Sequence, residues 1–266
     1  MRRICRALAG NIYHPQVSLR EGPLSWVRDS LKHRGFIGSL RFYAREFADM
    51  LRDLTPERRK SRYGDIDFDV EHNVDTTWAT ISLRTRIREW LSGGQYQPSE
   101  PALFGQMIES LPVSVDGFTF VDLGSGKGRT LLMASNHPFR RILGMELLEE
   151  LDDVAKRNIA RYHSKDQRCF VLESHAGDAR YFEFPAEPII LYLFNPFPRH
   201  IWREVLANLY RSQRAVPRPA YVIYHNPVHE DIFRTQAWLR EVARTHQYIV
   251  YHAELPQPTP DSLPQS

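Results

Sequence analysis

Residues 120–130 of the chain read FVDLGSGKGRT, an apolar run that ends in an acid and continues into alternating glycines. The acid is Asp122, and the glycines are Gly124, Gly126 and Gly128. A strand that ends in a glycine-rich turn and leads into a helix lets a ligand approach the backbone closely. The stretch therefore predicts a ligand site at the carboxyl end of a strand.

The spacing of the glycines indicates which kind of ligand such a turn binds. The phosphate loop requires G-x-x-x-x-G-K-[ST], but here Gly126 and Lys127 are followed by Gly128, and position 121 is a valine. The dinucleotide turn requires G-x-G-x-x-G, and its third glycine would fall on Arg129. The remaining pattern is D-x-G-x-G-x-G, with a nicotinamide-dependent oxidoreductase kept as an alternative because variants of the dinucleotide turn exist.

The composition is typical of a globular protein. Of the 266 residues, 42% are hydrophobic and 25% are charged. No apolar run approaches the ~20 residues that cross a bilayer, and the start, MRRICRALAGN, is too short and interrupted for a secretory signal. The two cysteines, Cys5 and Cys169, offer neither a disulfide framework nor zinc spacing. We expect a cytoplasmic protein without a metal site.

Positive charge is concentrated near the N-terminus. Residues 1–62 contain 14 Lys and Arg against 6 Asp and Glu, although the net charge of the whole chain is only +3. Such a basic arm suits an anionic partner, such as membrane headgroups, nucleic acid or an acidic protein, but a solvated helix surface explains it more simply. Helical periodicity over residues 24–54 fits either packing on the chain's own domain or peripheral contact with a membrane.

The chain divides into three parts by sequence texture. Residues 1–95 predict a basic helical extension, in which 63–79 form a long ordered loop or lid. From residue 96 to 254, short apolar runs alternate with amphipathic segments, which predicts an α/β domain with a mostly parallel sheet. Residues 255–266 predict a Pro-rich tail.

Element boundaries follow from the same alternation. The expected strands are 118–123, 141–147, 169–174, 188–195 and 220–226. The expected helices lie near 128–136, 149–162, 199–212 and 229–238. Residues 239–255 predict a closing antiparallel hairpin, although their first half could instead extend the preceding helix.

The D-x-G-x-G-x-G pattern resembles motif I of class I S-adenosylmethionine (SAM)-dependent methyltransferases, and the likeness extends over residues 96–254. It is closest to bacterial members of unassigned substrate and looser to non-SET protein-lysine methyltransferases, which share a DLGSG turn. The resemblance implies an α/β, Rossmann-like class I methyltransferase fold with a C-terminal antiparallel hairpin. It also implies SAM as the cofactor and methyl transfer as the reaction.

The resemblance assigns residues after each of the first four strands. Glu146 would hold the ribose hydroxyls of SAM, because a carboxylate accepts from both groups of a diol. Asp178 would lie near the adenine, and Asn195 in LFNPFP would orient the acceptor. The expected catalytic residues are Asn195, Pro196 and Phe197. The expected cofactor-binding residues are Tyr96, Pro98, Asp122, Gly124, Ser125, Gly126, Gly128, Glu146, Gly177, Asp178 and Ala179.

Several side chains have two interpretations. Tyr96 and Pro98 could line the methionine end of SAM, while Ser99 caps the next helix and Pro101 occupies its first turn. His225 could act as a base or be a buried structural histidine. Lys127 could point to solvent or form a salt bridge with the acidic segment 65–75.

Electrostatics suits the cofactor that the resemblance implies. SAM carries a sulfonium cation, so a pocket containing Asp122, Glu146 and Asp178 would attract it. Methyl transfer is an in-line displacement, and the protein's main work is to hold the nucleophile in line and exclude water.

The acceptor is not fixed by the sequence. We expect a small-molecule or protein amine or hydroxyl. Nucleic acid is less favoured, because N-P-F-P departs from the N-P-P-Y pattern of the N-methyltransferase motif. A module that binds SAM without catalysis is the alternative from a different class.

Overall fold

The computed structural model of the chain describes residues 36–37, 44, 66–77, 85, 98–194 and 196–255. Residues 36, 37 and 44 are helical, and the rest of the helices expected within 24–54 lies outside the described residues, as do Tyr96, Asn195 and the tail from residue 256. No helix in the described ranges is long and apolar enough to cross a membrane.

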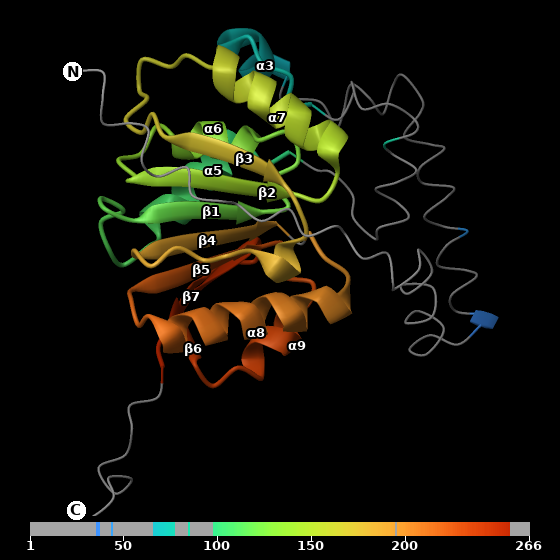
Figure 1. Cartoon of the computed structure of the whole chain (residues 1–266), viewed down its shortest axis with the longest axis vertical. Coiled ribbons are helices and arrows are strands. Elements are labelled where there is room, and N and C mark those ends of the chain that lie inside the picture. Colours follow the sequence, from blue (N-terminus) through green and yellow to red (C-terminus); the bar gives the residue numbers. More distant parts are fainter. Residues whose placement is uncertain are drawn as a thin grey trace, which may run out of the picture.

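One sheet of seven strands forms the centre of the described chain, in the order β3-β2-β1-β4-β5-β7-β6 (Figure 1). Neighbours from β3 to β5 pair in parallel, whereas β7 pairs antiparallel with both β5 and β6. This arrangement confirms the predicted fold class. The strands are β1 Thr119–Leu123, β2 Arg141–Glu146, β3 Leu172–Ala176, β4 Ile189–Phe194, β5 Ala220–His225, β6 Leu239–Arg244 and β7 Tyr248–Ala253.

The central strands are buried on both faces, which explains their continuous apolar sequences. Every residue of β1 and β5 is buried, as are the first five of β4. Helices cover both faces of the sheet (Figure 1). One apolar cluster contains residues of α5, α6 and Phe68 of α3, and the other contains residues of α8 and α9. The helices are α3 Ile66–His72, α5 Pro101–Glu109, α6 Arg129–Ala134, α7 Glu149–Arg161, η2 Ala179–Tyr181, α8 Arg199–Ala215 and α9 Glu230–Arg234.

Most boundaries lie within three residues of the sequence expectations, and three differences have a physical reason or change the type of element. β3 begins at Leu172 rather than at residue 169, because Phe170 and Val171 are exposed and their apolar character does not mark a buried strand. α9 ends at Arg234, and the interpretation of 239–244 as a helical extension is wrong, since those residues pair with β7. Residues 66–72 form a helix where a loop was expected.

The strand order reverses between β1 and β4. β2 and β3 extend to one side of β1, and β4 and β5 extend to the other. In open α/β sheets, ligands bind outside the carboxyl ends of the strands at such a reversal. The loops after β1 and β4 meet at this point.

Candidate functional site

The glycine turn after β1 contacts the loop after β4. A Cβ atom on Gly124 would lie 2.4 Å from Cβ of Pro196, and Gly124 has a φ of 89°. Only glycine fits this position without displacing Pro196. Gly128 precedes α6 with a φ of 82°, and its Cβ would lie 3.1 Å from Cβ of Ala155 in α7. The structure thus brings two predicted motifs, remote in sequence, into contact at the strand reversal.

Glu146 lies at the carboxyl end of β2, beside the glycine turn. Its Oε2 accepts a hydrogen bond of 2.9 Å from the Gly126 amide, and its Oε1 accepts one of 2.9 Å from the Leu148 amide. Burial raises the pKa of the Glu146 carboxyl, and these backbone bonds oppose the shift. Each carboxylate oxygen can accept a further hydrogen bond, so the geometry suits a diol at the edge of the turn.

Ser125 lies within the same turn, but its hydroxyl points inward. A Cβ atom on Gly144 of β2 would be 2.8 Å from Ser125 Oγ, so the hydroxyl lies close above β2. Ser125 Oγ is buried and has no hydrogen-bond partner among the residues that the structure describes. A buried hydroxyl without a partner is uncommon in native proteins and is often found at functional sites.

Asp178 and its neighbours lie next to Glu146. The Gly177 amide donates to the Glu146 carbonyl at 2.8 Å, which joins the loop after β3 to the end of β2. The Asp178 carboxylate pairs with Arg180, with Nη2 2.7 Å from Oδ2, and accepts from the Arg180 amide at 3.0 Å. Ala179 is buried in the apolar cluster on the α8 side. The roles of these residues toward a cofactor stay predictions.

Burial and pairing modify the charge of two of the three acids that were expected to attract a cation. Asp122 is 2% exposed, and burial raises its pKa to about 8, against the hydrogen bond from Thr130 and with a further increase from Glu146. Burial therefore favours the neutral form of the Asp122 carboxyl. The charge of Asp178 is balanced by Arg180. Sequence alone shows the acids but not their burial or their counter-ions.

The loop after β4 ends the strand and begins α8. The Phe197 ring packs edge-on against Trp202 at 5.2 Å, and the Trp202 indole donates to the Phe197 carbonyl at 2.9 Å. Pro198 is the residue preceding α8. Of the expected catalytic residues, Pro196 thus contacts the glycine turn and Phe197 packs toward α8.

A chain of neutral groups crosses the sheet close to this loop. Ser99 Oγ lies 2.7 Å from the Tyr192 hydroxyl, which lies 2.8 Å from His225 Nδ1. The His225 ring stacks on Phe194 with centroids 3.7 Å apart. Burial lowers the pKa of His225 to about 4, so its imidazole is neutral at neutral pH. These contacts support the interpretation of His225 as a buried structural histidine.

The predicted cap at Ser99 is wrong. Glu100 is the residue that precedes α5, and no side chain caps the helix. The Ser99 hydroxyl is instead used by Tyr192. Pro101 occupies the first turn of α5, as predicted.

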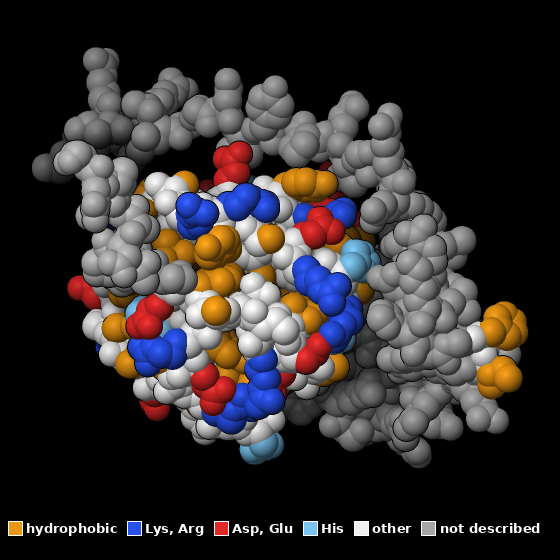
Figure 2. Space-filling model, turned by 90° about the horizontal axis from the view of Figure 1, so that it is seen from below, with side chains coloured by type: hydrophobic (Ala, Val, Ile, Leu, Met, Phe, Trp, Pro, Cys, Tyr) orange, Lys and Arg blue, Asp and Glu red, His pale blue; other side chains and the backbone are white. Residues whose placement is uncertain are grey.

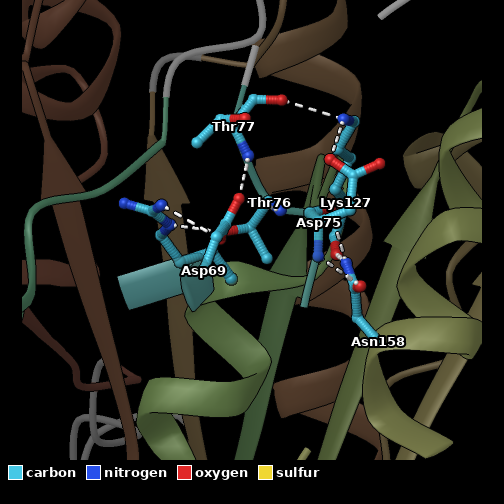
Figure 3. Close-up of polar contacts among 7 residues, drawn as sticks. Asp69, Asp75, Thr76, Thr77, Lys127 and Asn158 are labelled. Carbon is cyan, nitrogen blue, oxygen red and sulfur yellow. Dashed lines mark hydrogen bonds and ion pairs between the residues drawn. The ribbon is translucent and has the colours of Figure 1, made fainter. Parts of the chain in front are cut away.

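A second polar network surrounds the glycine turn, and it is built from charges. We call residues 66–77, which comprise α3 and the loop after it, the strap. Lys127 is 2% exposed, and its Nζ lies 2.8 Å from Asp75 Oδ1 and 2.8 Å from the Thr77 carbonyl oxygen (Figure 3). The alternative in which Lys127 forms a salt bridge with the acidic segment is therefore confirmed.

Arg129 makes the second connection to the strap. It is 1% exposed, and its Nε donates to Thr76 Oγ1 at 2.6 Å. Its guanidinium also lies 3.4 Å from Asp69 Oδ1 and 4.9 Å from the centre of the Phe68 ring. Burial lowers the pKa of Arg129 to about 10, so the side chain remains charged at neutral pH.

The surface gives no single basic face around α8, α9 and β6. Figure 2 views the molecule from the end where these elements lie, and positive and negative side chains are interspersed there. Arg199 pairs with Asp231, and Arg244 pairs with Glu230 and Glu241. A nucleic-acid backbone would require positive charge without such counter-ions.

Comparison with known proteins gives structural matches only. No protein-family model matches the chain, and no curated protein matches it. Among the solved structures that it resembles is an RNA methyltransferase from Salinibacter ruber in complex with S-adenosyl-L-homocysteine (SAH). It is 20% identical, with a TM-score of 0.43, and the match covers 63% of this chain and 99% of that one.

Two further solved structures are described as SAM-dependent methyltransferases. One is a TehB-like protein from Corynebacterium glutamicum, 17% identical, with a TM-score of 0.40 and coverage of 64% of this chain and 95% of that one. The other is a protein from Thiobacillus denitrificans in complex with SAH, 19% identical, with a TM-score of 0.38 and coverage of 54% and 55%. At these identities the likeness concerns the fold.

Sequence reasoning found the turn, Glu146 and the loop after β4, but it missed most of the two polar networks. The sequence signal for the charged network was the presence of Lys127 and Arg129 on either side of Gly128, because a ligand-binding turn normally carries small residues there. The signal for Asn158, which joins the strap to the turn, was a polar residue on the apolar side of an amphipathic helix. Nothing in the sequence indicated that Tyr192 and Ser99 would meet.

Proposed function

We propose that this chain binds SAM and transfers its methyl group to an acceptor. The observation that carries the proposal is the contact between the glycine turn and the loop after β4 at the strand reversal. That crevice is where ligands bind in open α/β sheets. A cofactor held by the turn would therefore lie next to the segment that the resemblance assigns to the acceptor.

The residues present fit the cofactor in two respects. Glu146 is held at the end of β2 by two backbone amides, and its oxygens retain acceptor capacity toward a ribose diol. The turn beside it has glycines with positive φ and exposes its backbone at Gly124. Lys127 and Arg129 are both buried and paired, so neither of them is exposed at the turn to bind a phosphate. This suits SAM, which carries no phosphate.

When bound, SAM supplies an electrophilic methyl group on a good leaving group. The chain's own residues then have to bind, orient and exclude water. Glu146 would fix the ribose, and the turn would accommodate the methionine portion. Asn195 and Pro196 would orient the acceptor beside the turn, since Pro196 already contacts Gly124.

The acceptor that we favour is an amine or hydroxyl of a small molecule or a protein. The intermixed and paired charges of the α8, α9 and β6 surface support this choice over nucleic acid. The buried groups behind the acceptor side, Tyr192 and His225, are neutral, which suits an acceptor that arrives uncharged.

The nicotinamide alternative is less well supported. The dinucleotide-binding fold has the strand order 3-2-1-4-5-6, whereas here the antiparallel β7 lies between β5 and β6. A module that binds SAM without catalysis shares the same binding geometry. Only a measurement of methyl transfer to an acceptor distinguishes such a non-catalytic module from an enzyme.

Calorimetric titration of the purified protein with SAH, with NAD in a parallel titration, tests the proposal. We expect micromolar binding of SAH and no heat from NAD. The variant Gly126→Val should abolish SAH binding, because its side chain would enter the space of the cofactor and because Gly126 has a φ of 54°.

Gly117→Val is the matched control. Gly117 also has a positive φ, of 79°, but lies before β1 at the other edge of the sheet with nothing within 4 Å of its Cβ position. It carries the same backbone strain and should leave SAH affinity unchanged. Binding of NAD alone, or equal SAH affinity in the Gly126 variant, contradicts the proposal.

A further inference from the structure

The charged network around the glycine turn has no role in the function proposed above. Lys127 and Arg129 are 2% and 1% exposed, and both flank Gly128. A buried charge is unfavourable unless it is paired, and here the strap supplies a carboxylate to each of the two cations. The strap therefore helps to stabilise the turn in this form.

The acidic side of the network is organised to receive these cations. Asp69 accepts from the amides of Thr76 at 2.8 Å and Thr77 at 2.9 Å, and also from the Thr76 hydroxyl. These bonds fold the loop after α3 back onto the helix. They direct the Thr77 carbonyl toward Lys127 (Figure 3). They also direct the Thr76 hydroxyl toward Arg129.

Asn158 extends the coupling from side chains to the backbone of the turn. It is 1% exposed on α7, and its Oδ1 accepts from the Asp75 amide at 2.8 Å. Its Nδ2 donates to the Asp75 carbonyl at 2.8 Å and to the Lys127 carbonyl at 2.9 Å. The side-chain amide of Asn158 therefore holds both the strap, at Asp75, and the backbone of the turn, at Lys127 (Figure 3).

We propose that the strap is a cofactor-positioning element, which holds the glycine turn in its binding shape through Lys127, Arg129 and Asn158. The proposal rests on the proposed function, because it concerns the affinity of the same turn for SAM. Binding free energies are reciprocal. If the strap raises the affinity of the turn for the cofactor, then the cofactor must stabilise the strap to the same degree.

The strap contacts also cross the boundary that the sequence placed at residue 95. The Lys127–Asp75 and Arg129–Asp69 pairs join the extension to the α/β domain. The positioning residues therefore come from both sides of that boundary, and the experiment uses the full chain.

The first measurement is the SAH affinity of Asp75→Ala and Lys127→Met by calorimetry. Asp75→Ala removes the carboxylate that pairs with the buried Lys127 and should weaken SAH binding at least tenfold. Lys127→Met removes the buried charge, and the Asp75 side chain is already 40% exposed to water in the wild type, so this variant should fold even if Asp75→Ala does not. We expect it to weaken SAH binding several-fold, and the double variant to bind no worse than Asp75→Ala alone.

Asp67→Ala is the matched control. Asp67 is an exposed acid on the same helix and should leave SAH affinity unchanged. Circular dichroism of each variant reports folding separately. A purely structural strap would lower the melting temperature of the variants but leave the SAH affinity of the folded protein as it was.

Hydrogen exchange of the wild-type protein gives the reciprocal readout. SAH should slow exchange at the Thr76 and Thr77 amides, and this protection should be reduced in Lys127→Met. If the wild type binds SAH while Lys127→Met binds it equally well and these amides exchange at unchanged rates, the inference is wrong and the proposed function stands. If the wild type does not bind SAH, the proposed function fails, and the inference fails with it.

Discussion

The two buried polar networks near the site differ in chemistry. The network at the glycine turn consists of ions, with Lys127 and Arg129 paired to the strap. The network at the β4–β5 side consists of the neutral groups Ser99, Tyr192 and His225. Both networks join segments that are distant in sequence, but only the first depends on balancing charge.

This difference predicts how each network responds to change. Removing one member of a buried ion pair leaves an unpaired charge, which costs far more than the pair contributes. A chain of neutral groups carries no such risk at neutral pH, but it becomes unfavourable when one member gains a charge. The ionic network should therefore be sensitive to mutation and the neutral network to acid.

The largest expected effect is from Asp69→Ala in the ionic network. The substitution removes the carboxylate that faces the buried Arg129 and that accepts from the Thr76 and Thr77 amides, so we expect a loss of about 3–5 kcal/mol in the free energy of unfolding. Chemical denaturation at neutral pH measures it. Asp67→Ala, on the exposed side of α3, should cost less than about 0.5 kcal/mol. Equal losses in both variants would mean that the pairing does not stabilise the fold.

The next effect is acid sensitivity in the neutral network. His225 has a pKa lowered by burial to about 4, so the unfolded chain binds a proton at this group below about pH 6.5 while the folded chain does not. Stability is therefore full above pH 6.5 and falls as the pH decreases toward 4, by about 3 kcal/mol from this group.

Denaturation of the wild type and of His225→Gln between pH 7 and 4 isolates this contribution. The glutamine variant can still bond to Tyr192 but cannot gain a charge, so its stability should fall less. His137 and His229, whose pKa values are also lowered by burial, remain in both proteins and cancel in the difference. Parallel pH profiles for the two proteins would contradict the prediction.

The smallest effect concerns the contact that joins the two sides of the site. Gly124→Ala places a Cβ atom 2.4 Å from Pro196, whereas Gly117→Ala, at a similar positive φ, meets nothing within 4 Å. We expect Gly124→Ala to be less stable than Gly117→Ala by about 1–3 kcal/mol, the usual cost of overpacking. Similar stabilities would show that the loop after β4 moves away from the turn without cost.

The sequence predicted the fold and the position of the glycine turn, for a physical reason. Buried parallel strands such as β4 are continuous apolar runs, and a turn such as that at Gly124 requires glycine, so both leave local signals. Glu146 was assigned by the resemblance, and it lies beside the turn because the carboxyl ends of adjacent parallel strands meet at one edge of the sheet.

The remaining features depend on which distant groups meet. The sequence of the glycine turn does not show that Lys127 pairs with Asp75. It also does not show that Asp122 is buried and that burial raises its pKa. The position of Ser99 before Pro101 is typical of a helix cap, but its hydroxyl instead forms a hydrogen bond with the Tyr192 hydroxyl. Such contacts are decided by packing, and no local pattern of residues carries them.

The position of the strap in the chain also bears on the order of folding. α3 has seven residues, too few for a stable isolated helix, and its cationic partners lie more than fifty residues later in the sequence. During synthesis, α3 emerges well before β1 and α6 exist. We therefore expect α3 to become helical only after the α/β domain has folded. The first element along the chain with described bounds would then be one of the last to fold.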